Sequence, residues 1–207
     1  IQFNCRVGNL LLFVVLHTPG VVFRQIAEGN TRIIGSVQKL TFLLILLPPV
    51  FSFIGSTLFG WRLGAADPLY FDSTARVIIS FFYADALILG YISTALIARW
   101  MSKTYGGGKV PTASLFAFFT VVLAPICIAS AAHIFPHIFF NVLVLIPTII
   151  WSMTLLYRGL PVVMNIPPER GMLMSSSLVG WLLVAFVSLL GLSAALWTYG
   201  IGPSIGV

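Results

Sequence analysis

One acidic residue lies inside an otherwise apolar stretch of the chain. Asp85 stands in the middle of the segment 77–98, in the run Phe-Phe-Tyr-Ala-Asp-Ala-Leu. A carboxyl group at the centre of a membrane helix costs about 2.5–3.5 kcal/mol on insertion scales, so it is expected to face protein or water. Asp85 is then either a site for a proton, a cation or a polar ligand, or a neutral acid that hydrogen-bonds a neighbouring helix. The candidate partners for the second interpretation are Asn141, Thr148 and Ser152.

Two histidines form a second candidate site. His133 and His137 are four residues apart, but Pro136 between them favours a turn at that point. With Asp67 and Asp72 they suggest a divalent metal site on the outer face of the protein. The alternative is that both histidines cap a helical hairpin at the membrane surface.

Catalytic combinations are otherwise missing from the sequence. It has no convincing Ser-His-Asp set, no paired catalytic carboxylates and no Cys-x-x-Cys zinc spacing. We therefore expect a protein that is not an enzyme and that needs no cofactor.

The composition predicts the elements that carry these residues. Of 207 residues, 59% are hydrophobic and only 8% are charged, against about 25% charged in an ordinary soluble domain. A bilayer removes the need for a charged coat, and a crossing takes about 20 apolar residues. We expect an all-α protein that spans the membrane five times, with a domain over 37–207. The predicted spans are 40–59, 77–98, 115–134, 138–157 and 177–197.

Basic residues predict the orientation of these spans. Nine of the eleven lysines and arginines fall on one side of the predicted membrane, and only Arg62 and Arg76 fall on the other. By the positive-inside rule, the N-terminus is cytoplasmic and the C-terminus is outside. Residues 1–36 are predicted to form a cytoplasmic, amphipathic segment at the membrane surface.

The positive charge is spread between apolar stretches and forms no run, which argues against a nucleic-acid partner. It suits contacts with the headgroups of anionic lipids. The residues predicted to make these contacts are Arg24, Arg32, Lys39, Lys103 and Arg170.

The segment that begins at Tyr157 resembles the loop before the last span in prokaryotic members of the Yip (Ypt-interacting protein) family. The family pattern, Tyr-x-Gly-Leu-x-x-x-Met-x-x-Pro, is matched by Tyr157, Gly159, Leu160, Met164 and Pro167. The resemblance implies a five-helix fold with a cytoplasmic N-terminus in a bacterial inner membrane. The Asp-Leu-Tyr-Gly-Pro motif of eukaryotic members is not reproduced, so GTPase binding is not carried over.

Three functions remain open at this point. The first is a non-enzymatic scaffold or accessory subunit that associates with other membrane proteins or with copies of itself. The second is a small transporter or channel that uses Asp85. The third is the binding of anionic lipids.

Overall fold

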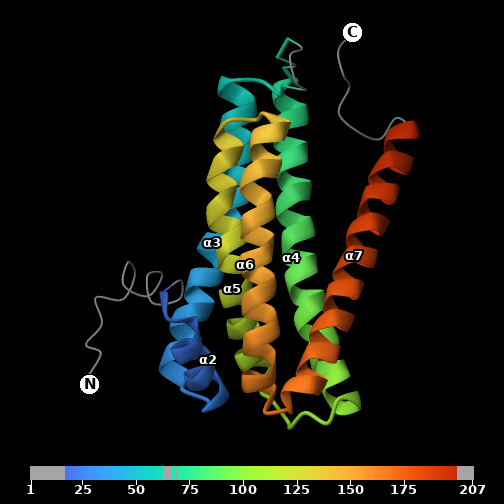
Figure 1. The fold of residues 1–207 in the computed structure, drawn as a ribbon. Helices are drawn as coiled ribbons and strands as arrows, with labels where there is room; N and C mark the ends of the chain where they lie inside the picture. The colour runs from blue at the N-terminus through green and yellow to red at the C-terminus, as the bar shows by residue number, and fades with distance from the viewer. Residues whose placement is uncertain (1–16, 63–66, 69, 200–207) are drawn as a thin grey trace.

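The computed structural model describes residues 17–62, 67–68 and 70–199 of the chain. Five long helices run along one common direction and form a bundle, with one short helix beside its lower end (Figure 1). All five are long and apolar enough to cross a membrane. The predicted all-α, five-span fold is therefore confirmed. The helices are α2 Pro19–Ala27, α3 Thr31–Leu58, α4 Ser73–Thr104, α5 Thr112–Ala129, α6 Ile138–Met164 and α7 Pro168–Thr198, with a 3-10 turn η1 at Ser130–Ile134.

The long helices extend past the predicted spans, mostly at the basic end of the bundle. α3 starts at Thr31 rather than at residue 40, and α6 continues to Met164 rather than ending at 157. Polar residues mark the end of an apolar stretch in the sequence, but a helix can continue through them. Where a helix ends depends on the groups that cap its terminal amides and carbonyls. The Asn30 side chain accepts the amides of Arg32 and Ile33 at 3.2 and 3.4 Å, which fixes the start of α3.

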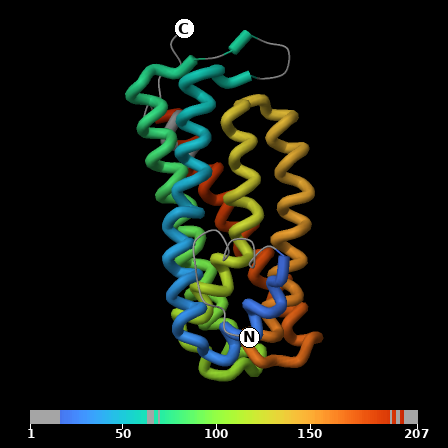
Figure 2. The backbone as a smooth tube through the Cα atoms, turned by 90° about the vertical axis from the view of Figure 1, so that its left-hand side faces the viewer, coloured from blue at the N-terminus to red at the C-terminus, as the bar shows by residue number. Residues whose placement is uncertain are grey.

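The N-terminal segment differs from the expectation in two ways. The expected boundary at residue 36 falls inside α3, because α3 already begins at Thr31. The apolar side of α2, formed by Val22, Phe23 and Ile26, is buried against the bundle rather than turned toward lipid. α2 packs on α5 and α6 (Figure 2). An amphipathic pattern shows that one face must be covered, but it does not show what covers it.

Helix α5 forms the centre of the bundle. It packs against α2, α3, α4 and α6, and its residues are buried on nearly every side. Leu115, Phe118, Val121 and Ala124 are completely buried. The 3-10 turn η1 continues α5 and leads directly into α6, so that α5 and α6 form the expected tight antiparallel hairpin.

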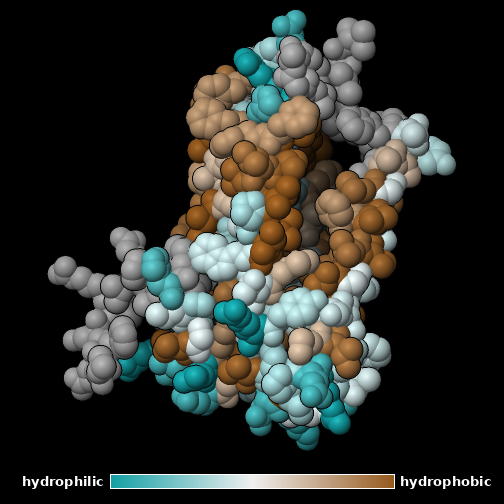
Figure 3. Space-filling view, in the orientation of Figure 1, coloured by the Kyte–Doolittle hydropathy of each residue, from teal (hydrophilic) through white to brown (hydrophobic). Residues whose placement is uncertain are grey.

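Helix α7 packs against the other helices along only part of its length. Its first half contacts α4 and α6 and buries Met174, Ser175 and Leu178. From Leu182 to Leu190 it is exposed on nearly all sides. In Figure 1 this outer half leans away from the bundle, and in Figure 3 a cleft separates it from the remaining helices.

Candidate functional site

Asp85 lies on an exposed face of α4. Its neighbours at spacings of three and four residues, Phe81, Phe82, Ile88 and Leu89, are exposed as well. This spacing places them on one side of a helix. These five residues, the α4 stripe, form an apolar face with one carboxyl group at its centre.

Asp85 makes no hydrogen bond or ion pair with any residue in the described part of the chain. Two of its three expected partners bond elsewhere, and the third, the buried Ser152 hydroxyl, has no hydrogen-bond partner in the described part of the chain. Asn141 bonds to His133, and the Thr148 hydroxyl donates to the carbonyl of Val144 in its own helix. Since α4 packs chiefly against α3, α5 and α7, the expectation that Asp85 bonds to α6 is not met.

His133 is the centre of a polar network at the outer end of the bundle. Its Nδ1 lies 2.6 Å from Asn141 Oδ1, and its Nε2 lies 3.2 Å from the Tyr83 hydroxyl. The Asn141 amide nitrogen donates to the carbonyls of Phe135 and His137 at 2.9 and 3.0 Å. Because that orients the Asn141 oxygen toward His133, Nδ1 is the donor. In the neutral ring, Nε2 then accepts from Tyr83.

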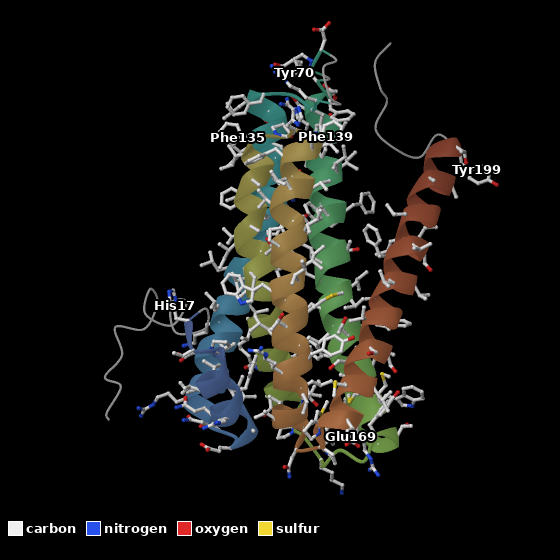
Figure 4. The ribbon with its side chains drawn as sticks, viewed as in Figure 1. His17, Tyr70, Phe135, Phe139, Glu169 and Tyr199 are labelled. Atoms are coloured by element: carbon white, nitrogen blue, oxygen red, sulfur yellow. The ribbon has the colours of Figure 1, made fainter. Side chains whose placement is uncertain are left out.

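This network ties three elements together, since Tyr83 is on α4, His133 on η1 and Asn141 on α6. Phe135 and Phe139 flank the turn at the upper end of the view in Figure 4. For His133 the geometry favours the second of the two interpretations, in which the side chain holds a helical hairpin. The His137 side chain makes no capping hydrogen bond, and only its backbone carbonyl takes part. Asn141, expected as a partner of Asp85, instead orients His133.

The other residues of the suggested metal site do not join this network. The Asp72 carboxylate caps α4 by accepting the amide of Thr74 at 3.2 Å. That hydrogen bond, with the one from the Ser73 amide, holds the pKa of Asp72 below its ordinary value. Within the described ranges, no three His, Cys, Asp or Glu side chains gather in a way that could hold a metal ion.

We expect Asn141→Leu to lower the free energy of unfolding by about 2 kcal/mol, because it leaves the two carbonyls and His133 without their partner. Thr154→Val is the matched control, since the Thr154 hydroxyl bonds only to the carbonyl of Ile150 in its own helix. Thermal unfolding in a mild detergent measures both variants. Equal melting temperatures for the two would show that the network does not stabilise the fold.

A second polar network, which was not predicted from the sequence, joins three helices in the interior. The hydroxyls of Thr41 and Thr120 lie 2.6 Å apart. The Tyr91 hydroxyl lies 2.9 Å from that of Thr120 and donates to the Phe116 carbonyl at 2.8 Å. The available signal was the presence of hydroxyl side chains inside three predicted spans. Inside a membrane such hydroxyls bond across helices and hold them together.

The family-motif residues meet at the basic end of the bundle. Leu160 and Met164 are completely buried. A Cβ atom at Gly159 would lie within 2.8 Å of the rings of Phe23 and Phe118, so only glycine lets α2 approach α6 this closely. The Tyr157 hydroxyl lies 2.9 Å from that of Ser176, which joins α6 to α7. Pro167 stands just before α7.

The motif is thus a packing joint for α2, α6 and α7. Its residues hold these helices together.

The predicted lipid-contact residues lie toward one end of the molecule. All five are exposed. Four are on α2 or at the ends of α3, α4 and α7 that lie where Figure 4 labels Glu169, and Lys39 is about two turns further along α3. Arg170 also has a local role, because its guanidinium lies against Gly106, a residue with a φ of +75°. The set comprises Arg24, Arg32, Lys39, Lys103 and Arg170.

The five apolar helices define a multi-pass, α-helical membrane protein. The chain belongs to the Yip1 domain family, whose match covers residues 13–199. This confirms the resemblance found in the motif that begins at Tyr157.

Two curated relatives are similar over nearly their whole length. Each is an inner membrane protein YohC, one from Escherichia coli strain K12 and one from E. coli O6:H1. Both are 25% identical over 182 residues, which is 88% of this chain and 93% of the relative. No solved structure matches the chain. Together with the five apolar helices, these relatives identify a multi-pass protein of the bacterial inner membrane.

Proposed function

We propose that this protein is a non-enzymatic scaffold or accessory subunit, which associates with another membrane helix along the α4 stripe. The observation that carries the proposal is the position of Asp85. It is exposed, it lies well inside a membrane helix, and it has no partner in the described part of its own chain. A polar group in lipid gains free energy when another helix supplies a hydrogen-bond partner.

The rest of the stripe suits such a contact. Phe81 and Phe82 are 68% and 61% exposed, and Leu89 is 55% exposed. Apolar side chains spaced by three and four residues pack against a second helix, and one polar residue among them fixes its register. The partner is either another membrane protein or a second copy of this chain.

We expect Asp85→Leu to weaken the association about fivefold, the equivalent of about 1 kcal/mol for one hydrogen bond between membrane helices. The stability of the separated chain should not fall, because the substitution places an apolar side chain toward lipid. Native mass spectrometry after gentle extraction from the source membrane measures the bound fraction. Ser188→Leu is the control, since it replaces an exposed polar residue on α7, outside the stripe.

Two outcomes would contradict the proposal. One is a wild-type chain that is stable, strictly monomeric and free of any co-purifying protein. The other is an equal loss of association in the Asp85 and Ser188 variants.

Transport through Asp85 is the competing explanation, and flux separates the two. Under the scaffold proposal, proteoliposomes that contain the wild-type protein carry no flux of protons, metal ions or small solutes. Flux that Asp85→Asn abolishes would establish a transporter or channel instead.

A further inference from the structure

A shallow, open furrow lies on one face of α6 and runs toward its cytoplasmic end, defined by the positive-inside rule. Its volume is about 410 Å³. The residues that line it follow one another at helical spacings, so the furrow is parallel to the helix axis. At a rise of about 1.5 Å per residue, its lining extends about 12 Å. The lining residues are Ile150, Met153, Thr154, Tyr157 and Arg158.

The furrow is polar at one end and apolar at the other. Ile150 and Met153 form the part that is deeper in the membrane, and both are exposed. Thr154 adds no free donor there, because its hydroxyl bonds to the carbonyl of Ile150 at 2.9 Å. Tyr157 is held in place by its bond to Ser176 on α7. The polar end lies toward the cytoplasmic leaflet and the apolar end lies deeper, which is the polarity order of an amphiphile in that leaflet.

Arg158 supplies a free positive charge at the polar end. Its side chain is exposed and pairs with no carboxylate in the described part of the chain. It lies near the end of α6, which stops at Met164. Tyrosine and arginine at such a depth lie at the level of the lipid headgroups. A guanidinium there binds a phosphate through two parallel N–H donors.

We propose that this furrow binds one anionic glycerophospholipid. Its phosphate lies against the Arg158 guanidinium, and one acyl chain lies along Met153 and Ile150. The site is on α6, whereas the proposed protein contact is on α4, so either proposal can fail without the other.

The test is native mass spectrometry of the full chain in detergent, with phosphatidylglycerol or phosphatidylcholine added at known concentration. We expect the wild-type protein to retain one phosphatidylglycerol in preference to phosphatidylcholine. Arg158→Gln should lower that retention about tenfold, the equivalent of one hydrogen bond to a charged group. Lys109→Gln is the matched control, because Lys109 is an exposed cation on the same side of the membrane, outside the furrow.

Two further variants keep the result interpretable. Met153→Trp fills the apolar part of the furrow and should also lower retention, while Arg158→Lys should restore part of it. Thermal unfolding of each variant shows whether it is folded. Equal losses in the Arg158 and Lys109 variants would overturn the proposal, as would equal retention of the two lipids. Displacement of the lipid by millimolar inorganic phosphate would identify an anion site without lipid specificity, and would also overturn it.

Discussion

Phe118→Ala is expected to lower the free energy of unfolding by about 3–5 kcal/mol, the cost of removing a fully buried aromatic side chain. Phe118 is completely buried at the centre of α5. Its ring lies 5.4 Å from that of Phe23 on α2 and 5.0 Å from that of Phe119, measured between centroids. The alanine variant leaves a cavity where α2, α5 and α6 meet, which the glycine at position 159 cannot fill. Unfolding by a denaturing detergent measures the loss.

The control for this prediction is Phe42→Ala. Phe42 is on α3 and is 76% exposed, so it faces lipid rather than protein. Removing it exchanges one lipid contact for another, and the free energy of unfolding should change little. Equal losses in the two variants would show that α5 is not the packing centre of the bundle. A selective loss in Phe118→Ala should also release α2 and expose it to proteolysis, because α2 packs on this ring.

Gly55→Ala is expected to lower the free energy of unfolding by about 3 kcal/mol, at the upper end of the usual cost of overpacking. A Cβ atom at this position would collide with the backbone carbonyl of His133 and would lie 2.8 Å from the carbonyl oxygen of Ile134. Backbone atoms cannot rotate out of the way as a flexible side chain does. The turn η1 would therefore shift, and the bonds that join His133 to Tyr83 and Asn141 would lengthen.

Gly90→Ala is the control for Gly55→Ala. Gly90 is also in the interior of a membrane helix, but a Cβ atom there would meet nothing within 4 Å. Alanine is the better helix former by about 1 kcal/mol, so this variant should be as stable as the wild type or more so. Thermal unfolding compares the two variants. If Gly55→Ala and Gly90→Ala have the same melting temperature, α3 does not pack on η1 as closely as described.

Spacing in the sequence predicted the hairpin between α5 and α6, because only three residues separate two apolar segments. It did not predict the role of the histidines within that hairpin. The 3-10 turn places His133 beside Asn141, and Gly55 on α3 allows the close approach. These contacts join residues from separate helices, and a pattern within one segment carries no information about them.

The motif at Tyr157 also separates what the sequence predicts from what contacts between helices decide. Its residues identified the family from the sequence, but their role was clear only when Phe23 and Phe118 were found against Gly159. A small residue in a helix predicts a close contact without naming the partner. The partner of Gly159 is the short helix α2, whose amphipathic sequence predicts a position on the membrane surface.

The sequence by itself determined that the chain spans the membrane five times and which end is basic. Both properties depend on the transfer of residues between water and lipid, which is a sum over local composition. The tertiary structure decided what covers each face. It buried the apolar side of α2 in the bundle, directed Asn141 to His133 and left Asp85 exposed on α4. Lipid and protein interiors are equally apolar, so hydropathy cannot distinguish a face that meets lipid from one that meets another helix. Only the shape and hydrogen bonding of the assembled helices make that choice.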